Sequence, residues 1–339
     1  MEKREPVGLA IINYTTIVTA IDDAAVVDLM REALVAQSRG QCATPMPMHL
    51  DIAPESAEVH VKSSYRAGGP FFVLKVASTF PRNAARGLST GNGIMLLVSA
   101  HTGEPSAVLV DHGHLTDVRT AAVTAMTSRE LGRRDAVLGI IGSGIQARLQ
   151  ARFHRAVLAL EEVVVWGRDP VRAAACARDI EAEATAAGRP VRTTVAASPG
   201  EVASHARVIV TCTMSRAPLL ELADLQPGTL VNAVGADGPG KQELDPGILR
   251  AASLLLIDSL AQCARLGELQ HALDQQDRAI EIGAYIDHPD RPPSGDLAVC
   301  DFTGLGVEDL YIAEHVYQYV HQRVDHHVQD QAEEQTHAH

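Results

Sequence analysis

The sequence predicts an α/β protein, in which a doubly wound parallel sheet of the Rossmann type is joined to an antiparallel α+β domain. From residue 136 onward, near-continuous apolar runs alternate with amphipathic helical segments, which is typical of a parallel sheet covered on both faces. The apolar run that begins at Val137 leads directly into a glycine turn. Between Val59 and Asp111, short runs rich in Val, Phe and Leu are each bounded by Gly, Pro or Asn, which indicates an antiparallel sheet.

Composition excludes several classes of protein. The chain has 339 residues, enough for two domains, and a formal net charge of −13 with no basic block, which argues against nucleic-acid binding. No stretch approaches 18 uncharged apolar residues and the N-terminus lacks a signal core, so we expect neither a membrane span nor export. Five dispersed cysteines argue against a disulfide framework and a zinc site. The histidines show no HExxH-like pairing, so we expect no metal site and a cytoplasmic protein.

The elements of the first domain follow in order. Residues 22–38 have helical apolar spacing behind an acidic first turn. Four strands are then expected at 58–65, 71–79, 93–100 and 105–111, and an alanine-rich helix at 116–131. A last helix at 307–324 has apolar spacing for docking on the body.

The predicted boundaries follow from these elements. We expect a substrate-binding and dimerisation domain at 1–118 together with 306–325, and a Rossmann dinucleotide-binding domain at 119–305. The polar tail 326–339 is expected to be disordered.

The glycine turn is the strongest local motif. It follows a strand, opens a helix and precedes a second strand at βαβ distance. In the pattern GxGxxA, the first glycine makes the turn, the second lets the backbone approach a pyrophosphate, and the alanine allows close helix–strand packing. The predicted cofactor contacts are Gly142, Ser143, Gly144, Ile145, Gln146 and Ala147.

The residue at the end of the second strand indicates whether such a domain prefers NAD or NADP. An acidic residue there binds the ribose 2′-hydroxyl of NAD, whereas an arginine accepts the 2′-phosphate of NADP. Arg168 stands at this position and Arg172 one turn later, so NADP(H) is favoured over NAD(H). Asp169 leaves NAD(H) open, although it also suits the N-cap of the next helix.

Three segments could carry chemistry. Lys75 interrupts an apolar strand, so its ammonium must find an anion or reach water at a sheet edge. Arg119 lies in the first turn of a helix, where a cation opposes the dipole, and it could capture a carboxylate in a bidentate way. Asp237 and Lys241 follow a strand that ends in glycines, the place for catalytic groups in such sheets; the alternative is a charged surface loop.

Taken together, these segments resemble the ornithine cyclodeaminase/mu-crystallin family, from about Ala25 to Ala313. The resemblance is carried by a co-linear set of motifs: LKVAS…FPxN, GLSTGNG, TDVRTAA, GSGIQA, GADGPGKQEL and DFTGLGVEDL.

The resemblance implies a role for each residue. Lys75 would pair with the substrate carboxylate and help to activate the reacting carbon, and Arg119 would clamp the same carboxylate. Asp237 would exchange a proton with the substrate nitrogen. Further substrate contacts are expected at Thr90 and Lys241, and further cofactor contacts at Thr120, Val234, Gly235 and Gly304. The family also implies a homodimer and a small amino or imino acid as substrate.

One departure concerns the first sheet, where the family carries a carboxylate-binding arginine in a PxR segment. Here the segment reads TPMPMH, with Met48 at the expected position. Lys62, Arg66 or His49 could substitute, and Lys62 is the leading candidate. The methionine makes the pocket wall more apolar, which puts a simple α-amino acid such as ornithine in doubt.

These residues predict hydride transfer at a nitrogen-bearing carbon of a small amino or imino acid, in the manner of a ketimine reductase or an amino acid dehydrogenase. One alternative is a cyclodeaminase that recycles NAD and releases ammonia. A second is a non-catalytic, crystallin-like NADPH-binding protein, which the presence of Lys75, Arg119 and Asp237 disfavours.

Overall fold

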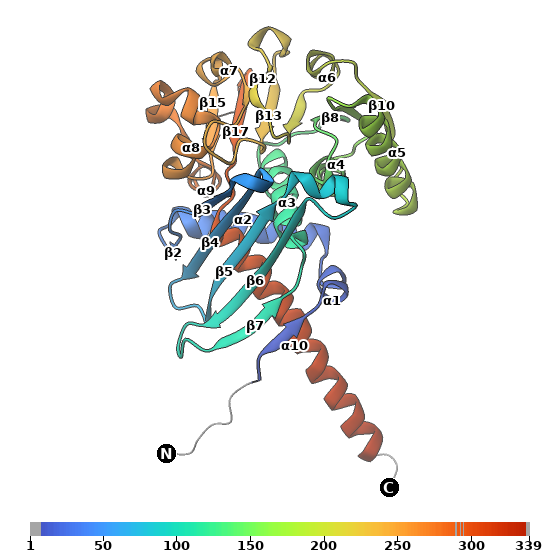
Figure 1. Cartoon of the computed structure of the whole chain (residues 1–339), viewed down its shortest axis with the longest axis vertical. Helices are drawn as coiled ribbons and strands as arrows, with labels where there is room; N and C mark the ends of the chain where they lie inside the picture. Colours follow the sequence, from blue (N-terminus) through green and yellow to red (C-terminus); the bar gives the residue numbers. More distant parts are fainter. Residues whose placement is uncertain (1–7, 289, 292, 294, 337–339) are drawn as a thin grey trace. The chain divides into compact units, whose positions relative to one another are not determined.

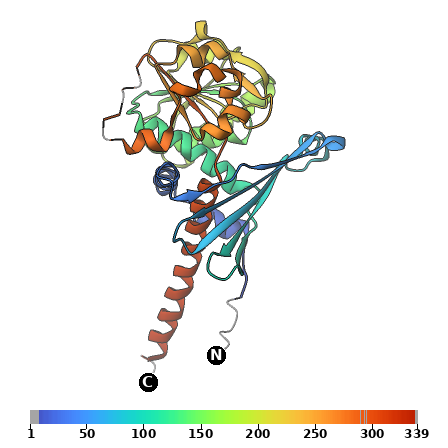
Figure 2. The same cartoon turned by 90° about the vertical axis from the view of Figure 1, so that its left-hand side faces the viewer.

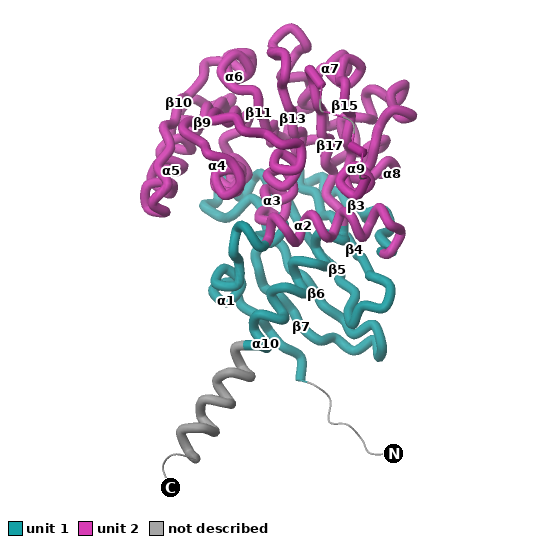
Figure 3. Tube along the Cα trace, turned by 180° about the vertical axis from the view of Figure 1, so that it is seen from behind, with its two compact units in different colours: residues 1–25, 42–116, 306–339 teal, residues 26–41, 117–305 magenta. Residues whose placement is uncertain are grey.

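The computed structural model describes residues 8–336 except 289, 292 and 294, with side chains up to residue 322. Backbone packing divides the chain into two compact units (Figure 3). Unit 1 comprises 1–25, 42–116 and 306–339, and unit 2 comprises 26–41 and 117–305. The predicted disordered tail, 326–339, lies outside the residues whose side chains are described.

Unit 1 is built on a seven-stranded sheet (Figure 1). Its order is β1-β7-β6-β5-β4-β2, with β3 also paired to β4. The strands are β1 (Ala10–Ile12), β2 (Cys42–Ala43), β3 (Met48–Ile52), β4 (Ala57–Arg66), β5 (Phe71–Thr79), β6 (Gly91–Ser99) and β7 (Pro105–Leu109). Pairing is antiparallel except between β1 and β7. The four expected strands are therefore present, and β1, β2 and β3 join them.

The two faces of this sheet differ. Successive side chains of a strand point to opposite faces, and Val73, Lys75 and Met95 lie on the buried face. The α-helices α1 (Tyr14–Thr19) and α10 (Gly306–Thr336) belong to unit 1. Helix α10 runs across β4, β5 and β6 (Figure 2). The approach is close, because a Cβ on Gly306 would collide with the backbone of Ser63. The C-terminal helix thus docks on the first sheet, as the sequence predicts.

Unit 2 contains an eight-stranded, fully parallel sheet of order β10-β9-β8-β11-β13-β17-β15-β16. Its strands are β8 (Val137–Ile141), β9 (Glu162–Trp166), β10 (Arg192–Val195), β11 (Val208–Thr211), β13 (Thr229–Ala233), β15 (Leu254–Ile257), β16 (Ile280–Glu281) and β17 (Leu297–Asp301). A small separate pair joins β12 (Arg216–Leu220) and β14 (Gln242–Leu244). The strand order reverses between β8 and β11, so ligands are expected at the carboxyl ends of these two strands.

Helices cover both faces of the parallel sheet. The α-helices that lie wholly or mostly in unit 2 are α2 (Asp23–Ser38), α3 (His114–Glu130), α4 (Ile145–Val157), α5 (Pro170–Ala186), α6 (Pro199–His205), α7 (Pro246–Ala251), α8 (Leu260–Leu266) and α9 (Ile282–Asp287). On one face, Val202 of α6 packs in a cluster with Val164 and Val231. On the other, Asn232 of β13 donates a 3.2 Å hydrogen bond to Ser128 of α3. The inner strands are buried on both sides, as their continuous apolar runs predict, whereas the edge strands β10 and β16 are partly exposed.

Most of helix α2 belongs to unit 2, whereas the sequence placed it in the first domain. A Cβ on Gly283 of α9 would collide with the carbonyl oxygen of Leu34, so α2 and α9 are in direct contact. Arg39 also forms a bidentate ion pair with Asp287, at 2.7 and 2.8 Å. The boundary was missed because the apolar stripe of a helix does not reveal which core it faces.

Among the described residues, no helix combines the length and the apolar character required to cross a bilayer.

Candidate functional site

The glycine turn has the geometry that its pattern predicts. Gly142 adopts φ +143°, and a Cβ there would lie 2.5 Å from the sulfur of Cys212. The turn therefore closes only with glycine, because β11 ends against it. Gly144 is the N-cap of α4, and a Cβ there would meet no atom within 4 Å. Protein packing leaves space in front of the helix N-terminus, where backbone N–H groups and the helix dipole favour an anion.

A cavity of about 260 Å³ adjoins this turn. Its lining includes Gly142, Gly144, Arg168, Asp169 and Arg172. The Asp169 carboxylate caps α5 by accepting from the backbone N–H groups of residues 171 and 172, at 2.9 and 3.3 Å. The acidic side chain at the strand end is thus engaged in its own helix, while both arginines are exposed beside the cavity.

Arg119 is buried, with 4% of its surface exposed. Gly304, at φ +75°, lies against its guanidinium so closely that a Cβ would collide with it. The Gly304 loop is fixed by Asp258, whose carboxylate accepts from the backbone N–H groups of Thr303 and Gly304 at 2.7 and 2.6 Å. Sequence reasoning missed Asp258; an acidic residue at the end of a buried strand was the available signal.

Asp237 and Lys241 form an ion pair in the loop after β13. Lys241 Nζ donates to Asp237 Oδ1 at 2.7 Å. The lysine side chain is 6% exposed and the aspartate side chain 43% exposed. The carboxylate is therefore held by the lysine and remains accessible to a small molecule.

Glu243 follows Asp237 and Lys241 in the same charged segment of the sequence. Unlike Asp237, it is fully buried, and its hydrogen bonds stabilise the loop. Its carboxylate accepts from the hydroxyls of Thr211 and Thr213 and from the backbone N–H groups of Thr213 and Gly235, all within 2.9 Å. Burial raises the pKa of Glu243, although these four hydrogen bonds oppose the shift. It joins the ends of β11 and β13 and thereby positions the loop that carries Asp237.

In unit 1, Lys75 is 1% exposed and its ammonium lies 2.9 Å from both carboxylate oxygens of Asp309 on α10. The anion that a buried lysine requires is thus supplied by the protein. Sequence reasoning quoted the DFTGLGVEDL segment without assigning Asp309. A carboxylate on the buried face of an otherwise apolar helix turn was the signal.

Lys62 lies directly opposite Lys75 in the antiparallel pairing of β4 and β5. It is 8% exposed and points to the same face. Met48, however, pairs with Val61, so strand alternation places it on the opposite face, where it is 57% exposed. The prediction that Met48 lines the pocket wall beside the lysines is corrected, because His49 is the β3 residue on that face.

The remaining predicted residues take mixed positions. Gln146 donates to the backbone and side-chain oxygens of Asp117 at 3.1 Å, which joins α4 to α3. Thr90 is exposed in the loop before β6. The other predicted cofactor residues belong to unit 2 and are buried or half-buried: Ser143, Ala147, Thr120, Val234 and Gly235. Ile145 is exposed beside the turn.

Parallel strand order, the glycine turn at the order reversal and the adjoining cavity together define an α/β protein of the dinucleotide-binding Rossmann class. The family can be stated more narrowly. Residues 11–323 match the model of the ornithine cyclodeaminase/mu-crystallin family, and the chain belongs to that family.

Three comparisons illustrate the range of relatives. The chain is 37% identical over 293 residues to "Uncharacterized cyclodeaminase y4tK" of Sinorhizobium fredii, covering 83% of this chain and 86% of the relative. It is 34% identical over 272 residues to "Iminosuccinate reductase" of Paracoccus denitrificans, covering 78% and 82%. The solved structure of an archaeal alanine dehydrogenase dimer with bound NAD superposes with a TM-score of 0.82 at 27% identity, covering 93% and 97%.

Proposed function

We propose that this protein is an NAD(P)(H)-dependent oxidoreductase that transfers hydride at the nitrogen-bearing carbon of a small amino or imino acid. The observation that carries the proposal is the half-exposed carboxylate of Asp237, held by the buried Lys241, in the same unit as the glycine turn. Relatives named iminosuccinate reductase, Δ1-pyrroline-2-carboxylate reductase and alanine dehydrogenase support this class of reaction.

Each residue then has a defined role. The nicotinamide cofactor supplies or accepts the hydride. In unit 2, Arg119 holds the substrate carboxylate. In unit 1, the cross-strand neighbours Lys62 and Lys75 place two positive charges on one face of the sheet. Asp237 gives a proton to the imine nitrogen, so that the carbon becomes more electrophilic, and as a carboxylate it stabilises the iminium. Lys241 orients Asp237 through their 2.7 Å contact.

The cofactor proposed is NADP(H) in preference to NAD(H). Arg168 and Arg172 both line the cavity beside the glycine turn and could form charge-assisted hydrogen bonds with a 2′-phosphate. Asp169, the acidic competitor, is engaged in capping α5. The proposed preference for NADP(H) differs from the NAD that is bound in two solved structures similar to this chain.

We also propose a homodimer formed through the open face of the first sheet. On that face, exposed apolar side chains accumulate from four strands: Ile11 (72%), Met48 (57%), Leu50 (52%), Ile94 (45%) and Val76 (38%). Contiguous exposed apolar surface of this kind marks an interface. The archaeal alanine dehydrogenase that superposes on this chain is a dimer. We expect the assembled enzyme in the cytoplasm, and all five cysteines are free thiols, in keeping with that compartment.

The test is a screen of imines and amino acids that follows NADPH absorbance and ammonia together. Candidate substrates include open-chain and cyclic ketimines of α-keto acids, with and without a second carboxylate. Stoichiometric oxidation of NADPH by an imine supports reduction.

A cyclodeaminase is the second candidate, because one relative is named a cyclodeaminase. Ammonia release from a diamino acid without net change of cofactor would establish that reaction and overturn the first. Binding of NADPH without any turnover across the screen would instead favour a non-catalytic, crystallin-like protein.

A further inference from the structure

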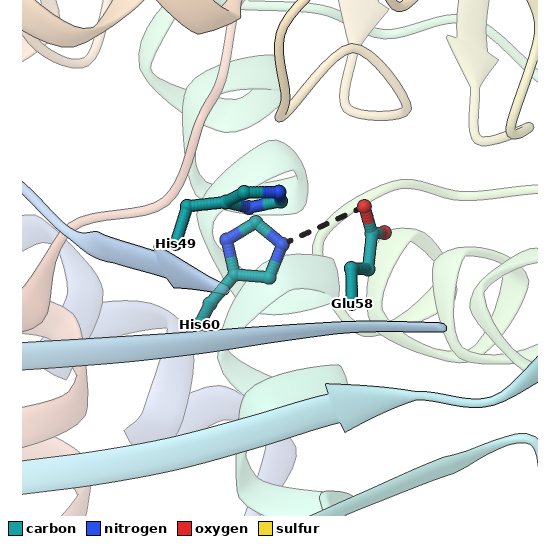
Figure 4. Close-up of side chains that lie close together, drawn as sticks. All are labelled: His49, Glu58 and His60. Atoms are coloured by element: carbon teal, nitrogen blue, oxygen red, sulfur yellow. Dashed lines mark ion pairs between the residues drawn. The ribbon is translucent and has the colours of Figure 1, made fainter. Parts of the chain in front are cut away.

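Three metal-ligating side chains meet on the buried face of the first sheet, outside the residues assigned to hydride transfer. His49 of β3 and His60 of β4 are direct cross-strand partners. Glu58 lies two residues before His60, so it points to the same face. One ligand atom from each residue lies within 4.8 Å of the other two. Figure 4 shows the two imidazoles and the carboxylate converging.

The hydrogen bonds of His49 define which nitrogen is available. Its Nε2 lies 3.0 Å from Asp51 Oδ1, and a carboxylate can only accept, so Nε2 carries the proton and Nδ1 presents a lone pair. Within the described part of the chain, His49 Nδ1 is buried and makes no hydrogen bond. A carboxylate that orients a histidine in this way is typical of the outer shell of metal sites.

His60 offers a second nitrogen of the same kind. Its Nε2 is buried and forms no hydrogen bond among the described residues, and it lies 3.9 Å from Glu58 Oε2. Ligand atoms around a tetrahedral zinc ion are about 3.3–3.5 Å apart, as bond lengths of about 2.0–2.1 Å require. Because the ligand atoms lie within 4.8 Å of one another, side-chain shifts of about 1 Å would convert this arrangement into a coordination shell.

We propose that His49 Nδ1, His60 Nε2 and the Glu58 carboxylate bind one divalent transition-metal ion of the zinc type. Two imidazoles and one carboxylate suit Zn²⁺ and its neighbours, whereas Mg²⁺ and Ca²⁺ prefer all-oxygen shells. The three side chains are 14–27% exposed, so an ion can enter and retains an open position for water. The alternative is an edge-to-face histidine pair, with centroids 4.7 Å apart, beside a carboxylate.

Cobalt titration of the full-length protein tests the site independently of any reaction. Tetrahedral or five-coordinate Co²⁺ absorbs strongly in the visible range. Other histidines, including four at the C-terminus (His326, His327, His337 and His339), create a background, so the readout is the difference between the parent and the double variant His49→Ala/His60→Ala. We expect one equivalent of Co²⁺, displaced by Zn²⁺, to be lost in the variant.

Two further variants sharpen the result. Glu58→Gln should weaken binding by more than 100-fold, and Asp51→Asn by about 10- to 100-fold, because Asp51 acts through His49. The matched control His101→Ala removes an exposed histidine and should leave the titration unchanged. Circular dichroism verifies that each variant is folded. Identical Co²⁺ spectra and stoichiometry for the parent and the folded double variant would overturn the proposal, whether or not the enzyme reduces an imine.

Discussion

At the scale of single residues, the chemistry depends on charges that the fold has paired in different ways. Lys75 has a buried partner in Asp309, and Lys241 has a partner in Asp237 that remains 43% exposed. A buried pair fixes geometry, because breaking it leaves an uncompensated charge. A half-exposed carboxylate can still exchange a proton with a small molecule. Asp237 is therefore the residue to test for catalysis.

Asp237→Asn should lower kcat by about 100-fold or more, since positioned acid–base groups contribute about 10²- to 10⁴-fold. The affinity for NADPH, measured by fluorescence titration, should change by less than about 2-fold. Asp296→Asn, an exposed aspartate of the same unit, is the matched control. A kcat close to that of the parent would remove Asp237 from the mechanism.

Cofactor preference is also decided by single residues. Arg168→Ala should raise KM for NADPH by about 10- to 100-fold, the value of one charge-assisted hydrogen bond of about 1.5–3 kcal/mol. KM for NADH should change little. Arg178→Ala, which removes an exposed arginine of α5 that does not line the cavity, should change neither KM. Equal losses for both cofactors would contradict a 2′-phosphate contact.

At the scale of elements, helix α4 is held to α3 by polar groups that are themselves buried. His154 of α4 is fully buried, with Nδ1 2.9 Å from the Gln150 carbonyl oxygen and Nε2 3.0 Å from Ser128 Oγ. The Gln150 carbonyl can only accept, so Nδ1 carries the proton and Nε2 of the neutral ring presents a lone pair to Ser128 Oγ, whose one proton also faces the Thr124 carbonyl oxygen at 3.1 Å. Burial lowers the pKa of His154 to about 4. The contact between the helices therefore requires a neutral imidazole.

This predicts a pH dependence of stability. In the unfolded chain a histidine titrates near 6.5, so below this pH the unfolded state binds a proton that the folded state excludes. The contribution of His154 is complete above pH 6.5 and is lost as the pH falls to about 4, at about 1.4 kcal/mol per pH unit and about 3 kcal/mol in total. Urea unfolding between pH 7 and 4.5 measures the slope.

The variant His154→Gln should be less stable at pH 7. Its free energy of unfolding should also depend less on pH, by about the contribution of one proton. His205→Gln removes an exposed histidine and should keep the slope of the parent. Parallel pH profiles for the parent and His154→Gln would show that other groups dominate the acid sensitivity.

At the scale of the whole molecule, we propose that the open face of the first sheet forms the dimer interface. Val76 and Ile94 are direct cross-strand partners on that face, 38% and 45% exposed. Ile94→Glu would place a charge in the centre of an apolar interface, where burial of an unpaired charge is costly. We expect the dimer to dissociate, as measured by light scattering after size exclusion.

Leu222→Glu is the matched control, because Leu222 is 44% exposed but belongs to unit 2. It should leave the dimer intact. A monomeric parent protein would overturn the dimer proposal.

The sequence alone was sufficient to predict the parallel sheet, the glycine turn and the two arginines beside the cavity, Arg168 and Arg172, because these features depend on local patterns. Continuous apolar strands, positive-φ glycines and strand-end residues are encoded within about 30 residues. Strand alternation could also have excluded Met48, but only once β3 was recognised as paired with β4.

Only the tertiary structure decided which distant residues meet. Lys75 and Asp309 are separated by 234 positions, and no periodicity links a strand to a helix so far along the chain. The histidine pair His49 and His60 was overlooked for the same reason, since metal-site motifs are read along one element whereas these ligands face each other across two strands. Side-chain pairing across elements is a property of packing, and packing is settled only when the whole core forms.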